Sequence, residues 1–208
     1  MKKGRVKNKC PPKLFSRIKK RGDEVQTAED YYRNYLDGDK AAFSDIIDIY
    51  RENLIFFING YVKNEDTAEE LAADCFAELI VHPGRFKFKS SLKTYIFSIA
   101  HHKAVNFIKK NSRVILYESA ETVEKRTEYI EFENDILKDE QNRILHEALP
   151  KIKEDYRTAL HLVYFEEMSY KDAAKVMRKT AKQVDNYVSR GKAALRKILE
   201  EEGFGYEE

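Results

Sequence analysis

The chain has 208 residues, and its 38 basic and 36 acidic side chains leave a net charge of only +2. No run approaches eighteen apolar residues and no apolar segment follows the basic N-terminus, so neither a membrane span nor a secretory signal is expected. Cys10 and Cys75 lie far apart and form no metal-ligand motif, so we expect a reducing, cytoplasmic environment. The lack of Trp and the scarcity of Gly and Pro are typical of a soluble helical protein.

Charge is unevenly distributed along the chain. Residues 1–21 hold about ten Lys and Arg and no acid, residues 114–140 are mainly acidic, and the C-terminal part is basic again. We expect residues 1–24 to be a disordered basic tail. Residues 113–139 are predicted to form an acidic linker with at most one short helix, and residues 203–208 a second tail.

Two helices are predicted at the start of a first helical body. Apolar residues recur every three or four positions over residues 39–61, which indicates one long amphipathic helix. A second helix is predicted to begin at Thr67, where Glu70 completes a capping box. It should end at residues 82–84, a His-Pro-Gly sequence, because Pro and Gly cannot continue a helix.

The segment after the second helix alternates aromatic and basic side chains. Phe86 and Phe88 lie among Arg85, Lys87 and Lys89, in a stretch that is too short and too charged for a core element. Rings between cations can stack on unpaired bases while the cations hold phosphates. This segment therefore suggests nucleic-acid binding; a half-buried loop is the alternative.

A third helix is predicted over residues 92–110, and the three helices should form a compact bundle at 25–112. The adjacent residues His101 and His102 point about 100° apart on a helix, so they are a poor metal chelate. The chain has no Gly-rich phosphate loop and no nucleophile or metal-ligand motif. We therefore expect no enzyme activity, no cofactor and no metal.

Two helices follow each other closely in the last quarter of the chain, Ser169–Met177 and Thr180–Ile198. Each begins with a hydroxyl side chain that is followed three residues later by an acid or amide, Asp172 and Gln183 respectively. Such helices must turn sharply, which indicates a helix-turn-helix whose second helix lies in the DNA major groove. The alternative is a helical hairpin with a solvated basic face. This second helical body is predicted over 140–202.

These blocks, in this order, resemble the bacterial sigma-70 family of RNA polymerase initiation factors, in its small two-domain, extracytoplasmic-function-like group. Residues 41–80 resemble the family's first block, a long helix followed by a D-x-A-E-D-L-x-x-E-x-F type motif. In this chain the motif consists of Asp66, Ala68, Glu69, Glu70, Leu71, Asp74 and Phe76. Residues 85–113 resemble the promoter-melting and −10 recognition block, and residues 159–199 resemble the helix-turn-helix that reads the −35 element.

The resemblance implies an all-α protein in which a helical bundle and a helix-turn-helix bundle are joined by an acidic linker. It implies a sigma factor that directs promoter-specific initiation by recognising −10 and −35 elements and helping to melt DNA. The implied partners are promoter DNA, an anti-sigma factor, and core RNA polymerase through its largest subunit's coiled coil and its second-largest subunit. The acidic linker would mimic RNA phosphates or act as a plain tether, and the basic tail could alternatively contact upstream DNA.

The resemblance also assigns candidate residues to each partner. The candidates for core-polymerase binding are Asp66, Glu69, Glu70, Asp74 and Phe76. The candidates for −10 DNA binding are Arg85, Phe86, Lys87, Phe88, Lys89, Tyr95, His101, His102, Asn106, Lys109 and Lys110. The candidates for −35 DNA binding are Thr180, Lys182, Gln183, Asn186, Tyr187, Arg190, Lys192 and Arg196.

Several residues depart from the family's usual pattern. Tyr95 stands where Trp is usual, His101 where Arg is usual, and Asn106 where Asp is usual. Asp185 replaces a commonly basic residue, and an acid near phosphate should weaken binding unless it reads a cytosine amine. Arg178 replaces the usual Gly of the helix-helix turn, which would cost roughly 1 kcal/mol if the backbone there has a positive φ.

A helix-turn-helix regulator that acts without polymerase is the alternative function. It would account for the C-terminal half of the chain. It would not account for the acidic capped helix or for the aromatic and basic segment that follows it.

Overall fold

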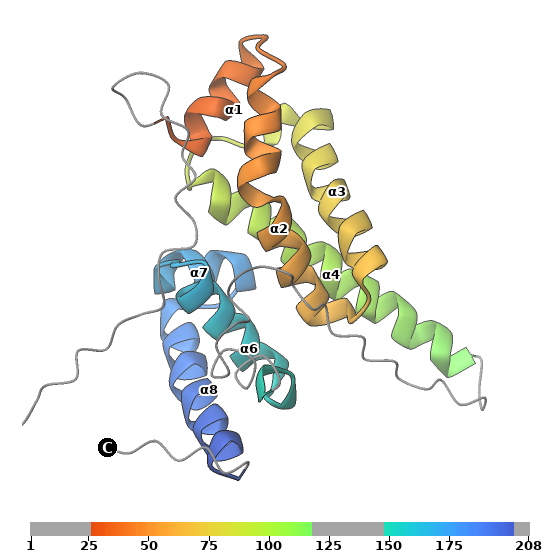
Figure 1. The fold of residues 1–208 in the computed structure, drawn as a ribbon, viewed down its shortest axis with the longest axis vertical. Helices are drawn as coiled ribbons and strands as arrows, with labels where there is room; N and C mark the ends of the chain where they lie inside the picture. The colour runs from red at the N-terminus through yellow and green to blue at the C-terminus, as the bar shows by residue number, and fades with distance from the viewer. Residues whose placement is uncertain (1–25, 118–147, 202–208) are drawn as a thin grey trace, which may run out of the picture. The chain divides into compact units, whose positions relative to one another are not determined.

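A computed structural model describes residues 26–117 and 148–201. These residues form helices and no strand, which confirms the predicted all-α fold (Figure 1). The α-helices are α1 (Ala28–Leu36), α2 (Ala42–Val62), α3 (Glu65–Val81), α4 (Leu92–Tyr117), α6 (Glu154–Leu160), α7 (Tyr170–Met177) and α8 (Ala181–Glu201). The predicted tails 1–24 and 203–208 and most of the predicted linker 113–139 lie outside the described residues.

The chain divides into two compact units, Met1–Ile49 and Tyr50–Glu208. The described part of the first unit contains α1 and the start of α2. A capping box begins α1: the Thr27 hydroxyl accepts from the Asp30 amide at 3.2 Å, and Asp30 Oδ2 accepts from the Thr27 amide at 3.0 Å. Tyr31 and Tyr32 on this helix are buried. The sequence pattern predicted three helices over 25–112, so α1 is an additional helix.

The start of α3 differs from the prediction. The helix begins at Glu65, and its cap is Asn64, whose Oδ1 accepts from the Thr67 amide at 2.8 Å. The predicted capping box of Thr67 and Glu70 is therefore wrong, because Asn64 already satisfies the amide that defines the helix start. The predicted end is confirmed, since α3 stops at Val81 and a short 3₁₀ turn follows at Pro83–Arg85.

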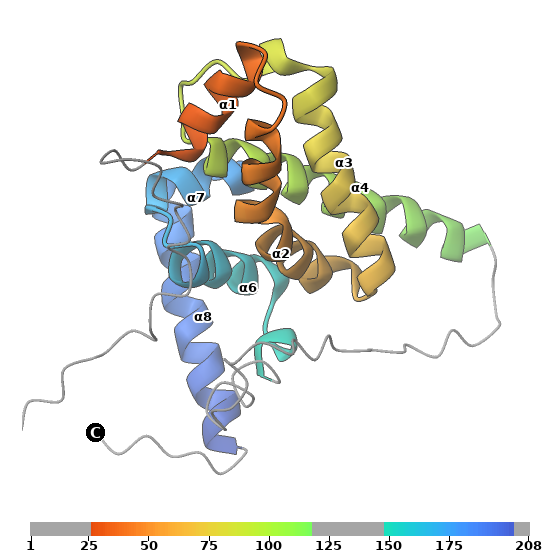
Figure 2. The same cartoon turned by 45° about the horizontal axis from the view of Figure 1, so that its top comes forward.

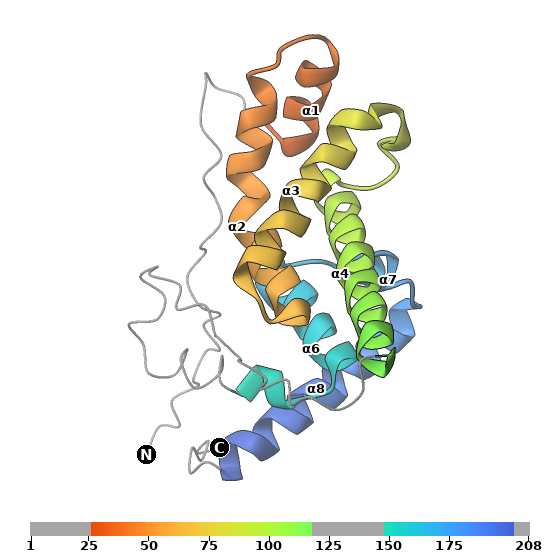
Figure 3. The same ribbon diagram turned by 90° about the vertical axis from the view of Figure 1, so that its right-hand side faces the viewer.

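The second unit has its core around α4. Helix α3 packs against α4 (Figure 3). Leu79 of α3 and Ile96 and Phe97 of α4 are at most 1% exposed. Helix α4 continues to Tyr117, beyond the predicted end at Lys110.

The C-terminal helices pack closely on one another. Helix α8 contacts both α6 and α7, and α6 lies across it (Figure 2). The close approach of α6 and α8 requires Gly191, because a Cβ atom there would lie 2.9 Å from Leu160 Cδ1. A π-helical turn, His161–Phe165, follows α6 and leads toward α7.

Candidate nucleic-acid interface

Both predicted helix starts in the C-terminal part are confirmed. The Ser169 hydroxyl accepts from the Asp172 amide at 3.1 Å and donates to the Asp172 carboxylate at 2.6 Å. The Thr180 hydroxyl accepts from the Gln183 amide at 3.2 Å, and Gln183 Oε1 accepts from the Thr180 amide at 2.8 Å. These caps fix where α7 and α8 begin, and thereby set the short connection between them.

The turn between α7 and α8 has the left-handed backbone that the sequence analysis considered. Arg178 has φ 53° and ψ 45° and ends α7. The Lys179 amide donates to the Ala174 carbonyl at 2.9 Å, which satisfies one of the last carbonyls of α7. Because Arg178 is not glycine, this turn costs roughly 1 kcal/mol. The connection nevertheless brings α7 and α8 together as a helix-turn-helix.

Helix α8 has one buried and one exposed face. Val184, Val188, Gly191 and Leu195 are buried against its neighbours. The exposed face holds Lys182, Gln183, Asn186, Arg190, Lys192 and Arg196. This face has the long polar and basic side chains that reach bases and phosphates in a major groove.

Besides Thr180, three more predicted −35 residues have contacts within the chain. Gln183 already uses Oε1 in the cap of α8, so in this conformation it would contact a base through its amide nitrogen. The half-buried ring of Tyr187 lies 5.9 Å from the ring of Tyr156. Lys192 Nζ lies 4.7 Å from the centre of the Tyr164 ring, a cation–π contact.

The aromatic and basic segment is partly core. Phe86 is 4% exposed, and its ring lies 4.6 Å from that of Phe88 and 5.1 Å from that of Tyr95. The expectation that this segment lies outside the core is therefore wrong for Phe86, because the other two rings lie beside it. Phe88 is 37% exposed and has φ 54°, and Lys87 and Lys89 are exposed. The segment presents one ring and three cations to solvent, and one of these cations, Arg85, pairs with Glu78.

Helix α4 exposes most of its predicted polar residues. The exposed ones are His102, Asn106, Lys109 and Lys110. His101 is different: its ring packs edge-on against Tyr61 at 5.7 Å. Burial and the charge of Arg178 lower the pKa of His101 to about 4, so this ring is neutral at pH 7. The ring is half-buried in this conformation.

Helix α3 carries an acidic face. Asp66, Glu69, Glu70 and Asp74 are exposed. Phe76, the remaining candidate of this helix, is only 6% exposed and belongs to the core. Glu78, also on α3, pairs with Arg85, a −10 candidate of the aromatic and basic segment.

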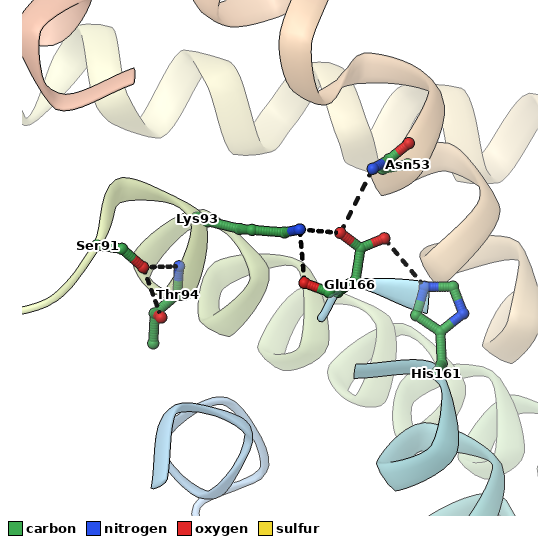
Figure 4. A network of polar contacts seen from close by, with 6 residues as sticks. All are labelled: Asn53, Ser91, Lys93, Thr94, His161 and Glu166. Carbon is green, nitrogen blue, oxygen red and sulfur yellow. Dashed lines mark hydrogen bonds and ion pairs between the residues drawn. The ribbon is translucent and has the colours of Figure 1, made fainter. Parts of the chain in front are cut away.

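A polar cluster that the sequence analysis missed surrounds Glu166, which is 3% exposed (Figure 4). Lys93 Nζ lies 2.8 Å from Glu166 Oε2 and donates to the Glu166 main-chain carbonyl at 2.7 Å. Asn53 Nδ2 donates to Glu166 Oε2 at 3.4 Å. His161 Nε2 lies 3.4 Å from Glu166 Oε1, outside hydrogen-bond geometry. We call Asn53, Lys93, His161 and Glu166 the Glu166 cluster.

Known families match both parts of the chain. The family described as "Sigma-70 region 2" matches residues 46–114, and the family described as "Sigma-70, region 4" matches residues 142–195. RNA polymerase sigma-H factor of Pseudomonas aeruginosa is 29% identical over 171 residues, which are 78% of this chain and 89% of that protein. The ECF RNA polymerase sigma factor SigW of Bacillus subtilis is 26% identical over 171 residues, 78% of this chain and 91% of that protein.

The chain belongs to the sigma-70 family, in its extracytoplasmic-function (ECF) group. Solved structures of low identity share its fold. The sigma factor RpoE in complex with the anti-sigma factor NepR, from Bartonella quintana, has a TM-score of 0.64 and 22% identity and covers 76% of this chain and 96% of that chain. CnrH in complex with the cytosolic domain of CnrY has a TM-score of 0.59 and 16% identity, with 82% and 95% covered.

Over residues 26–117 and 148–201, no three His, Cys, Asp or Glu side chains are grouped as metal ligands would be. In the same ranges, no helix has the length and apolar character needed to cross a membrane.

Proposed function

We propose that this chain is a sigma factor, which binds core RNA polymerase and directs promoter-specific transcription initiation. The observation that carries the proposal is the order of the two matches, region 2 followed by region 4, within one chain. The region 4 match contains the helix-turn-helix with its exposed polar and basic face. The region 2 match contains the acidic face of α3 and the segment with Phe88, Lys87 and Lys89.

Each surface has a proposed role. The exposed acids of α3, Glu69, Glu70 and Asp74 among them, bind core polymerase. The segment from Arg85 to Lys110 binds and helps to melt the −10 element, and α8 binds the −35 element. Unstacking a base costs a few kcal/mol, which contacts with side chains such as Phe88 offset. The protein performs no chemistry of its own in this account.

The proposed domains are 25–112 for region 2 and 140–202 for region 4, joined through 113–139. The site of action is the cytoplasm, where promoter DNA and polymerase meet. The solved RpoE and CnrH structures are complexes with NepR and with CnrY. An anti-sigma factor is accordingly a proposed partner of this chain.

The test is transcription in vitro with sigma-free core polymerase on fragmented genomic DNA, with the 5′ ends of the transcripts mapped. We expect discrete start sites that share a −35 and a −10 element and that depend on the added chain. If transcription stays non-specific while the chain alone binds duplex DNA tightly, the polymerase-independent regulator replaces the sigma factor. A sigma factor should bind promoter DNA poorly without core enzyme.

A further inference from the structure

The Glu166 cluster places a charged carboxylate inside the protein. Burial alone would raise the pKa of Glu166, but the neighbouring His161 and Lys93 outweigh burial and lower it. The carboxylate is therefore ionised at neutral pH. An ionised group with 3% exposure is strongly unfavourable unless it is paired. Removal of Lys93 from Glu166 would thus disfavour the packed arrangement.

The backbone around Glu166 is arranged to hold this position. The Glu166 amide donates to the His161 carbonyl at 3.0 Å, and the Met168 amide donates to the Leu162 carbonyl at 2.9 Å. Glu167 between them has φ 51°, an unfavourable left-handed conformation for a residue other than glycine. The preceding turn is π-helical, a feature found often at functional sites. An unfavourable local backbone is thus retained where Glu166 meets Lys93.

Aromatic packing fixes the same turn against α2. The His161 ring lies 5.3 Å from the ring of Phe56 and 5.2 Å from that of Phe57. The Tyr61 and Thr158 hydroxyls are hydrogen-bonded to each other, and both side chains are buried. The contact between Glu166 and Lys93 is therefore part of an extended buried surface.

This surface joins the two family regions. Asn53 and Lys93 lie in the region 2 match, whereas His161 and Glu166 lie in the region 4 match. Helix α7 also packs against α4 (Figure 3). We call this arrangement the closed form.

The closed form is incompatible with simultaneous binding of both promoter elements. Elements at −10 and −35 are about 25 base pairs apart, which is about 85 Å of duplex. Helices that pack against each other cannot reach both. The thirty residues 118–147 could span at most about 100 Å, so the covalent chain permits the required separation.

Lys93 is positioned to exchange its partner. It lies in the first turn of α4, between the aromatic and basic segment that ends at Lys89 and the candidate residue Tyr95. A carboxylate and a phosphate both accept charge-assisted hydrogen bonds from an ammonium group. The cation that Glu166 holds is therefore of the type that binds a DNA backbone next to the −10 element.

We propose that Glu166 is an autoinhibitory residue that occupies Lys93, a further DNA-binding residue, in place of a −10 phosphate and so keeps the free chain closed. This inference rests on the proposed function in one respect, the identity of the DNA. Binding of core polymerase and promoter would separate the pair and free Lys93 for phosphate. Closure itself is a property of the free chain and can be measured without polymerase.

The first experiment measures closure. Spin labels are attached to Asn111→Cys on α4 and Lys171→Cys on α7, both exposed, in the full chain with Cys10→Ser. Cys75 can stay, because burial raises the pKa of its thiol to about 12 and keeps it unreactive. Double electron–electron resonance should give a short, narrow distance distribution for the unaltered chain.

The variants compare matched changes of charge. Glu166→Gln should lengthen and broaden the distribution, whereas Glu167→Gln, the same change at an exposed neighbour, should leave it unchanged. Lys93→Gln removes the charge of the more exposed partner of the pair and should also lengthen the distance. An unchanged distance in Glu166→Gln, with the helical circular dichroism signal retained, would overturn the autoinhibitory role.

The second experiment measures DNA binding by the same free chains. The probe is a fluorescent single-stranded oligonucleotide of random sequence. If the closed form holds about nine-tenths of the molecules, Glu166→Gln should bind about tenfold more tightly, because apparent affinity follows the competent fraction. Lys93→Gln should open the closed form but should not bind the oligonucleotide more tightly. Glu167→Gln should bind it like the unaltered chain. Equal tightening in Lys93→Gln and Glu166→Gln would overturn the phosphate role of Lys93.

The two proposals fail separately. If none of these chains directs initiation with core polymerase, the sigma-factor function fails while the distance measurements still report on closure. If initiation is specific but Glu166→Gln stays closed, only the present inference fails.

Discussion

The ammonium group of Lys93 contacts Glu166 twice, at the carboxylate oxygen 2.8 Å away and at the main-chain carbonyl 2.7 Å away. The two residues are 73 positions apart and belong to different family regions. A double contact fixes the direction of the Lys93 side chain as well as its charge. A side chain of α4, the proposed −10 helix, is thus held by region 4 in the closed form.

Acidification should open the closed form through His101. The charged and titratable groups that act on this ring are Arg178, Asp155, His102 and Lys179, and burial is the largest influence. The pKa of His101 is about 4 when packed and 6.5 when exposed. The open form therefore binds more protons between these values, so closure weakens as pH falls below 6.5. At pH 5 the loss should be at most about 2 kcal/mol, because Tyr61, in the same family region, stays beside the ring when the regions separate.

The spin-label distance at pH 7.5 and pH 5 measures this effect. The pKa of Glu166 is lowered below 4.5, so its contribution is present at pH 5 and is lost only at lower pH. His101→Gln should abolish the change between the two pH values, and His102→Gln, at an exposed position, should retain it. A distance that changes equally in His101→Gln would assign the pH dependence to another group.

Replacement of the left-handed arginine should stabilise the helix-turn-helix. Arg178 has φ 53°, so Arg178→Gly relieves the left-handed conformation and should raise the free energy of unfolding by about 0.5–1 kcal/mol. Lys179→Gly is the matched control, because Lys179 has no positive φ. It should instead lose about 0.5–1 kcal/mol through greater freedom of the unfolded chain. Urea unfolding measures both, and equal losses in the two variants would contradict the argument.

Gly191 should tolerate no side chain, whereas Gly60 should. The Cβ of Gly191→Ala would lie 2.9 Å and 3.1 Å from two Leu160 side-chain carbons and 3.3 Å from Tyr156 Cβ. We expect a loss of about 1–2 kcal/mol as α6 and α8 move apart. Gly60→Ala in α2 has no neighbour within 4 Å and should gain about 0.5–1 kcal/mol from helix propensity. Thermal unfolding of both proteins measures the contrast; a stabilised Gly191→Ala would show that α8 approaches α6 less closely.

Two residues of α8 should affect promoter choice differently. Gln183→Ala should relax preference at one or two base pairs, at about 1–3 kcal/mol each. Arg190→Ala should weaken all promoters alike and reduce the salt dependence, as loss of a phosphate contact does. Lys197→Ala, exposed on the same helix with its Nζ 3.7 Å from Glu201 Oε1, is the control for charge. Relative initiation from a library of −35 sequences separates these outcomes, and equal loss across the library from both variants would refute the division of roles.

Local signals in the sequence predicted the helix-turn-helix well. Ser169 and Thr180 each act with a residue only three positions away, so the sequence contains the whole interaction. The same reasoning placed the α3 cap at Thr67 because a hydroxyl and an acid matched the motif, although Asn64 occurs three residues earlier. Where two such cap signals of similar strength lie close together, the sequence alone does not show which of them begins the helix.

Contacts between distant residues were not predictable in this way. Phe86 is buried beside Tyr95, and its flanking cations gave the opposite indication. Glu166 and Lys93 look like ordinary surface charges in the sequence, because the contact that buries them depends on the tertiary fold. The exposed surfaces of α3, α4 and α8 could thus be proposed from the sequence. The buried contact between Glu166 and Lys93 could not.

The most direct test of the whole account compares the distance between labels at residues 111 and 171 in the free chain and in a complex with core polymerase and a promoter. The account predicts a short distance in the free chain and an increase of several tens of ångströms in the complex, because the two regions then lie on elements about 85 Å apart. The same short distance in both states would contradict it, since one closed chain cannot contact both elements.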